Sequence, residues 1–175
     1  VVQNHAAVEI NRLDNSGYVL FSPPDDPHFR PKALIVKGDI QNQGDITIGP
    51  ERMLNILCGG NVDNGGHMGS LMGGTLKLAC NFLWNQADGE INSNGTLYIR
   101  AREEIFNEGV IAPSLGATTI SLYCDRLRNY GEIDGGKDDE GSDERGRVLV
   151  HARRGVENNG HIQAGGQPSS MTAEG

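Results

Sequence analysis

The stretch LYIRAREEIFNEGVI, residues 97–111, contains the two motifs that decide the fold of this 175-residue chain. Its first half places Leu97, Ile99 and Ala101 at alternate positions, which is the period-2 pattern of a β-strand. In its second half the aliphatic residue Ile105 lies two positions before Asn107, which begins the tripeptide Asn107-Glu108-Gly109. The apolar pair Val110-Ile111 follows this tripeptide. Both motifs recur along the chain, so the repeat is the first evidence for the fold.

The Asn-x-Gly motif recurs at spacings of 27, 22, 21, 22, 22 and 29 residues, by subtraction of the residue numbers. In one copy the glycine is displaced to Gly89. Stacked asparagine amides can hydrogen-bond to one another along an axis of parallel strands. We therefore predict an inward asparagine ladder made of Asn15, Asn42, Asn64, Asn85, Asn107, Asn129 and Asn158. We expect the glycine two residues later to supply the positive φ of a tight corner.

The strand motif lies upstream of the asparagine, and its third apolar position holds only small residues. We predict that this position forms an inward column in a tight part of the interior, made of Gly38, Cys58, Cys80, Ala101, Cys124 and Ala152. The intervening residues are often polar, so we expect them to face water. A unit of about 22 residues cannot bury its apolar face alone, so copies must stack.

These patterns predict one all-β domain over residues 1–175, a single-stranded right-handed parallel β-helix (β-solenoid) of about seven turns of 21–29 residues. No copy contains a ten-residue stretch of helical period, which disfavours helical and leucine-rich solenoids. Insertions at residues 20–33 and 135–147 interrupt the repeat. Such loops are common places for partner contacts, although tolerated surface loops are the more frequent case.

The charge and cysteine content exclude several classes of protein. Lys and Arg number 15 and Asp and Glu 23, a net charge of −8, which argues against binding to nucleic acid. No apolar run is long enough for a transmembrane helix, so no membrane insertion is expected. The three cysteines stand in a line rather than converging, and the histidines share no column. We therefore expect buried free thiols, no metal site and no cofactor.

The residue before each ladder asparagine defines an outward column, which consists of Asp14, Gln41, Asp63, Trp84, Phe106, Arg128 and Glu157. Trp84, Phe106 and Arg128 are consecutive in it and form a candidate contact face for a partner or subunit, for a covering loop of the chain itself, or for a sugar ring. The acids Asp14 and Asp63 are two turns apart, roughly 10 Å, which is wide for a pair of glycosidase carboxylates. We therefore assign no catalytic residue and expect no enzyme.

Two further motifs suggest modification or ion binding. Asn94-Gly95-Thr96 is a glycosylation sequon, which makes Asn94 a candidate glycosylation site and favours a secreted protein. The acidic loop 134–144 has carboxylates and glycines that could surround Ca²⁺. Its spacing does not match an EF-hand, and neighbouring basic residues can pair with its acids, so a solvated acidic loop is favoured over a calcium site.

The line Leu127-Arg128-Asn129-Tyr130-Gly131-Glu132-Ile133, together with residues 85–95, resembles the haemagglutinin-type repeats of filamentous bacterial adhesins. The repeated unit there is (Leu/Ile)-x-Asn-x-Gly-x-Ile, and the resemblance extends over nearly the whole chain. The unit here is slightly longer and less regular, and three turns carry cysteine. The resemblance implies an elongated structural or adhesive protein located outside the cell or on its surface.

The expected ends of the solenoid complete the functional prediction. The chain opens on Val1-Val2, and its last turn stops where another strand should begin, with no polar cap or helix at either end. We expect either that a longer polypeptide continues the solenoid or that copies stack head to tail into a filament. The alternative is a polysaccharide-binding or polysaccharide-cleaving β-helix that uses Trp84 and Phe106, with a glycan as its partner.

Overall fold

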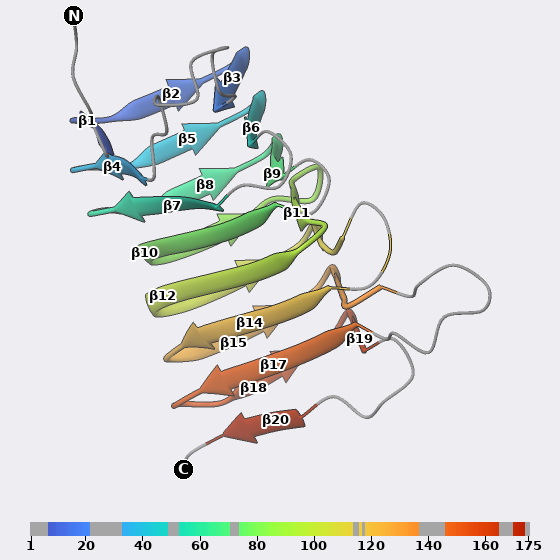
Figure 1. The fold of residues 1–175 in the computed structure, drawn as a ribbon. Helices are drawn as coiled ribbons and strands as arrows, with labels where there is room; N and C mark the ends of the chain where they lie inside the picture. The colour runs from blue at the N-terminus through green and yellow to red at the C-terminus, as the bar shows by residue number, and fades with distance from the viewer. Residues whose placement is uncertain are drawn as a thin grey trace, which may run out of the picture.

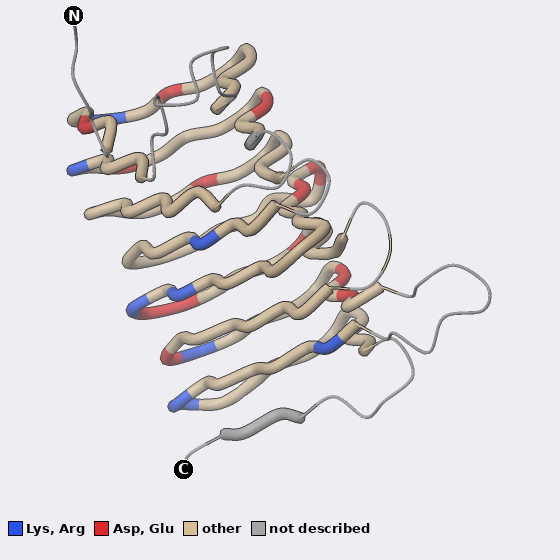
Figure 2. The backbone as a smooth tube through the Cα atoms, in the orientation of Figure 1, with Lys and Arg blue, Asp and Glu red and all other residues tan. Residues whose placement is uncertain are grey.

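The structure is a computed structural model that describes residues 7–21, 33–48, 53–70, 74–113, 116, 118–136, 146–164 and 170–173. The described chain winds as an all-β parallel solenoid, as the repeat predicts (Figure 1). Most of insertions 20–33 and 135–147 and most of the acidic loop 134–144 lie outside the described residues. Basic and acidic residues occur on successive turns rather than at one end (Figure 2).

Each turn contributes strands to three faces of the solenoid. The first face contains β1 (Ala7–Ile10), β4 (Ala33–Val36), β7 (Met53–Cys58), the first half of β10 (Thr75–Asn85), the first half of β12 (Thr96–Asn107), β14 (Thr119–Cys124), β17 (Arg147–Ala152) and β20 (Ser170–Ala173). The second contains β2 (Leu13–Asn15), β5 (Ile40–Asn42), β8 (Val62–Asn64), the second halves of β10 and β12, β15 (Arg126–Asn129) and β18 (Val156–Asn158). The third contains β3 (Tyr18–Phe21), β6 (Asp45–Ile48), β9 (His67–Ser70), β11 (Glu90–Ser93), β13 (Val110–Ile111), β16 (Glu132–Asp134) and β19 (His161–Gln163).

The regular part of the solenoid has about five turns of about 22 residues. Between Asn42 and Asn129 successive ladder asparagines are 22, 21, 22 and 22 residues apart. The flanking spacings are 27 and 29 residues. The regular part is shorter than the expected seven turns because the two predicted insertions lengthen the first and last spacings.

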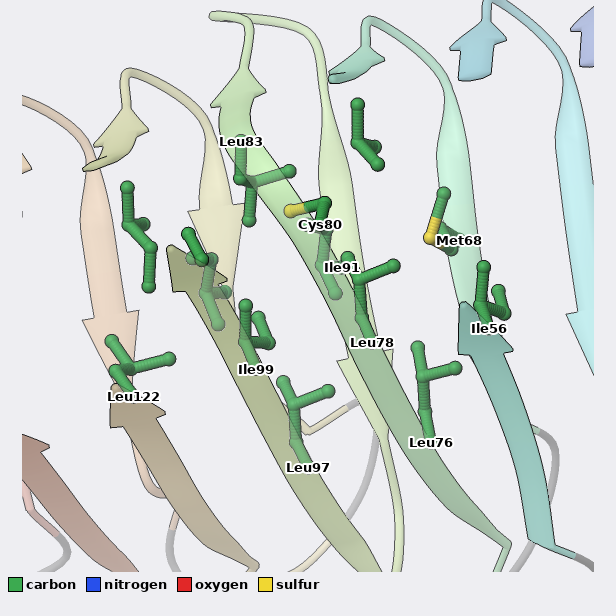
Figure 3. Packing of buried hydrophobic residues seen from close by; sticks show 14 of the residues in the cluster. Ile56, Met68, Leu76, Leu78, Cys80, Leu83, Ile91, Leu97, Ile99 and Leu122 are labelled. Carbon is green, nitrogen blue, oxygen red and sulfur yellow. The ribbon is translucent and has the colours of Figure 1, made fainter. Parts of the chain in front are cut away.

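The core consists of aliphatic columns that run parallel to the axis. Leu76 pairs in register with Leu97, and Leu78 with Ile99, and all four side chains are completely buried. Figure 3 shows these side chains on neighbouring strands, with Ile91 of the third face beside them. Burying one such side chain contributes about 1.5–3 kcal/mol, so the stacking of turns is what stabilises each turn.

The asparagine ladder is continuous through all seven predicted residues. Each side-chain Nδ2 donates to the Oδ1 of the next asparagine at 2.7 or 2.8 Å. The same amide nitrogens also donate to backbone carbonyls at the corner, as Asn85 does to Gly89 O at 3.1 Å and Val110 O at 3.2 Å. Among the described residues no buried side-chain nitrogen or oxygen is left without a partner. The ladder thus satisfies polar groups where the chain turns the corner.

The predicted small column is wrong at one position. Val36, not Gly38, pairs in register with Cys58, and Ile10 pairs with Val36. Gly38 lies beyond the end of β4, in a bend. The motif of alternating residues looks the same after a shift of two positions, so the sequence pattern did not distinguish the two registers. The side chains of this column become smaller along the axis. The column begins with Ile10 and Val36 and continues with the buried residues Cys58, Cys80, Ala101, Cys124 and Ala152.

The ladder glycines are required for a different reason from the one predicted. Positive φ occurs, among the described glycines, at Gly116, Gly136 and Gly155, none of which follows a ladder asparagine by two residues. A Cβ at Gly109 would instead lie 2.1 Å from the carbonyl oxygen of Gly89 in the previous turn. The glycines therefore allow backbones of successive turns to approach closely at the corner.

Candidate contact face

The outward column before the ladder has the register that the sequence predicts. Asp63 pairs with Trp84, Trp84 with Phe106, and Phe106 with Arg128, on neighbouring strands of the second face. Trp84 is 37% exposed, whereas Phe106 is half-buried. The two rings are stacked with centroids 6.4 Å apart and an interplanar angle of 23°. The structure therefore brings the three predicted contact residues together.

Neighbouring side chains cover much of Phe106. The Arg128 guanidinium carbon lies 4.6 Å from the centroid of the Phe106 ring, within cation–π distance. Tyr130 meets the same ring edge-on, with centroids 5.7 Å apart. Arg128 also forms an ion pair with Glu104, and this hydrogen bond raises the pKa of the guanidinium. Phe106 is thus the packed centre of the face, and Trp84 is its accessible edge.

Acidic residues fix the polar groups around this face. Trp84 donates its indole N–H to Glu108 Oε2 at 2.8 Å. Tyr130 donates its hydroxyl to Glu157 Oε1 at 2.6 Å. This bond lowers the pKa of the Glu157 carboxyl and raises the pKa of the Tyr130 hydroxyl. Glu108 and Tyr130 were not predicted, although both occupy the middle position of an Asn-x-Gly copy, which is a second outward column that the repeat itself defines.

A small cavity adjoins Trp84. Its volume is about 210 Å³, and its lining includes Gln41, Asp63, Phe82 and Trp84. Pockets that enclose a small organic ligand are typically about 300 Å³ or larger. The accessible edge at Trp84 therefore suits a flat contact better than an enclosed ligand.

The two acids of this column are engaged in separate contacts. Asp14 pairs in register with Gln41, and Gln41 with Asp63. The two carboxylates are therefore two turns apart, with the turn of Gln41 between them. Asp14 pairs with Arg12 at 2.8 Å, and Asp63 accepts a hydrogen bond from Gln86. Each carboxylate has a local structural partner, and the column does not place them as a facing pair.

The three thiols are free and buried. The Cys58 thiol donates to Gly38 O at 3.1 Å. Burial raises the pKa of all three thiols, and that of Cys124 reaches about 12. Protonated thiols are weak nucleophiles and weak metal ligands. Among the described residues no group of three or more His, Cys, Asp or Glu side chains is placed to hold a metal ion.

Asn94 lies in the bend between β11 and β12 and is half-buried. Its glycosylation stays a prediction. The described residues contain no helix with the length and apolar character needed to cross a bilayer.

Comparison with protein-family models, with curated proteins and with solved structures found no match. The likeness to haemagglutinin-type repeats therefore rests on the parallel solenoid and its asparagine ladder, without an assigned lineage.

Proposed function

We propose that this chain is a non-enzymatic structural module that continues along its axis, either by stacking head to tail on further copies into a filament or by joining adjacent solenoid turns of a longer, adhesin-like chain. The observation that carries the proposal is the direction of the asparagine ladder. Every link has the same sense, with the earlier asparagine as donor and the later one as acceptor.

The two ends of the ladder are therefore chemically complementary. At the first turn the Asn15 side-chain oxygen accepts from the backbone N–H of Gly17 at 3.1 Å instead of from a preceding ladder amide. At the other end Asn158 accepts from Asn129 and is exposed, and no further ladder asparagine follows it in the described residues. An Asn158 amide could donate to the Asn15 oxygen of another copy, which would extend the ladder without a change of direction.

The apolar columns also become accessible at both ends. Leu13 and Val19 are only partly buried, whereas Ile40 and Ile46, their register partners in the next turn, are completely buried. At the other end Val156 and Ile162 are partly buried, next to fully buried Leu127 and Ile133. On the second and third faces the end strands β2, β3, β18 and β19 have one described neighbour each. On the first face β20 already pairs with β17, so the chain begins a further turn there instead of stopping before it as the sequence pattern predicts. Stacking another turn on either end would pair their backbones and bury these side chains.

Head-to-tail stacking joins two different surfaces of the same protein. When the rotation between successive copies does not close a ring, the contact repeats and produces an open filament. The resemblance to adhesin repeats supports an extracellular or cell-surface location for such a module. Glycan binding or cleavage through Trp84 and Phe106 has weaker support, because Arg128 and Tyr130 cover Phe106 and the adjoining cavity is small.

The test is the mass and shape of the purified chain at increasing concentration. Light scattering should report a mass that grows with concentration, and electron microscopy should show unbranched rods with the width of one solenoid. A constant monomer mass with no rods would contradict stacking between copies.

A further inference from the structure

The first face carries a groove that neither the ladder nor the aromatic contact face explains. Its volume is about 900 Å³, and its lining extends from Ile35 of β4 to His151 of β17. These two strands are separated by β7, β10, β12 and β14 in the sheet. At about 4.8 Å per strand, the groove extends over roughly 24 Å along the axis. A groove of this length suits an extended chain better than a compact molecule.

The groove is hollow where one small residue, Ala79, interrupts an outward column of larger ones. Leu57, Ala79, Arg100, Tyr123 and His151 follow one another in register along this column. Ala79 and the neighbouring Gly59 leave space beside the large side chains on the adjacent turns.

Uncompensated positive charge lies at its centre. Arg100 and Arg102 are both exposed on β12, both line the groove, and neither has an ion-pair partner among the described residues. The acid in the groove lining, Asp125, is already paired with Arg153 and Arg154. A cationic centre in a chain of net charge −8 indicates an anionic ligand.

Aromatic side chains lie beside the arginines. Tyr98 and Tyr123 have ring centroids 5.1 Å apart, and Tyr123 and His151 have centroids 5.9 Å apart. Tyr123 is 37% exposed and pairs in register with Arg100. Tyrosines combine a flat apolar ring with a hydroxyl, and this combination suits the two faces of a sugar ring. The row runs along the axis, in the direction of the groove.

We propose that this groove binds an acidic polysaccharide, an extended chain of sugar rings that carry carboxylates and that lies parallel to the solenoid axis. Arg100 and Arg102 lie two positions apart on β12, at one level of the axis, and would bind the carboxylate of the sugar that lies over this strand, because a guanidinium fork matches a carboxylate in two parallel hydrogen bonds. Tyr98 and Tyr123 would pack against the rings. A single-stranded nucleic acid carries one negative charge per nucleotide, as the polysaccharide carries one per sugar, so the oligonucleotide in the test below distinguishes the two.

This proposal does not rest on axial assembly. The groove lies on the side of the solenoid, between its ends, and would bind equally in a monomer or in a filament. In a filament the grooves of successive copies would follow one another along the axis. One long polysaccharide could then bind several copies at once, with an increased overall affinity.

The test is binding of a hexamer of galacturonic acid by calorimetry at low salt, compared with the methyl-esterified hexamer, which has lost its charges. We expect binding of the acidic hexamer, weakening as salt is added, and at least about tenfold weaker binding of the ester. The variant Arg100→Gln/Arg102→Gln should weaken binding of the acidic hexamer by about a hundredfold, because each arginine loses a charge-assisted contact. Tyr123→Ser should weaken both hexamers.

The matched control is Arg12→Gln/Arg126→Gln, which removes the same charge from exposed positions outside the groove. It should bind like the unmodified protein. The proposal is wrong if the acidic hexamer does not bind, if the two double variants lose affinity equally, or if the ester binds as well as the acid. Tighter binding of a single-stranded oligonucleotide through the same arginines would overturn the assignment to carbohydrate.

Discussion

Asn85 donates its side-chain amide to the side-chain oxygen of Asn107 across one turn of the solenoid, at 2.8 Å, and both side chains are completely buried. The same relationship links each ladder residue to the next. The ladder therefore has a direction, and it connects the interior of every turn to the ends where further turns could add.

Replacing Asn85 by alanine should destabilise the fold by about 3 kcal/mol. The substitution leaves the buried Asn107 oxygen without its ladder donor, which costs about 1–3 kcal/mol, and also removes one of the three acceptors of the Asn64 amide. Urea unfolding measures the change. The matched control is Asn158→Ala at the exposed end of the ladder, which should cost less than about 1 kcal/mol. Equal losses would contradict the assigned role of burial.

Two glycines in equivalent motif positions should respond oppositely to alanine. A Cβ at Gly109 would meet backbone oxygen at 2.1 Å, so Gly109→Ala should destabilise by about 2 kcal/mol or more. A Cβ at Gly17 has nothing within 4 Å, so Gly17→Ala should be neutral or stabilise by about 0.4–1 kcal/mol. Thermal unfolding of both variants compares them directly. Destabilisation by both would favour a requirement for positive φ instead of close approach.

The buried thiols predict a loss of stability at high pH. Burial raises the pKa of Cys124 to about 12, so the folded state favours the neutral thiol. This contribution is fully present below the unfolded thiol pKa of about 8.5 and is lost as the pH rises toward 12. Cys124→Ala should flatten this part of the pH profile, because its register partner Ala152 shows that alanine fits the column. An unchanged slope would contradict the assignment to Cys124.

The same burial predicts that a thiol reagent does not react with the native protein near neutral pH. In urea all three cysteines should react, because unfolding exposes them and lowers their pKa values to the ordinary range. A colorimetric thiol assay with and without urea measures both states. Rapid reaction of any cysteine in the native state would place that thiol outside the core.

The sequence was sufficient for the ladder, the aliphatic columns and the outward order of Trp84, Phe106 and Arg128, because a repeat in one dimension fixes which positions stack. It was insufficient for the register and the end of β4, since the alternating pattern has the same appearance whether it ends at Val36 or at Gly38. It identified the corner glycines but not the close backbone contact that requires them. The groove beside Arg100 was not predicted, because concavity depends on the sizes of side chains on several turns.

Axial stacking can be tested with one variant for each end. Val19→Glu places a charge on the first turn, and Ile162→Glu places one on the last, and both positions are partly buried at the ends of the same column. Each variant alone would keep one functional end. Leu57→Glu, at an exposed position in the middle of the rod, is the control and should leave stacking intact.

The most direct measurement is the mass, by light scattering, of each end variant alone and of their equimolar mixture. Head-to-tail stacking predicts monomers for each variant alone and a dimer for the mixture, because the intact last turn of one can receive only the intact first turn of the other. Filaments formed by either variant alone, or a mixture that stays monomeric while the unmodified chain forms rods, would contradict head-to-tail stacking.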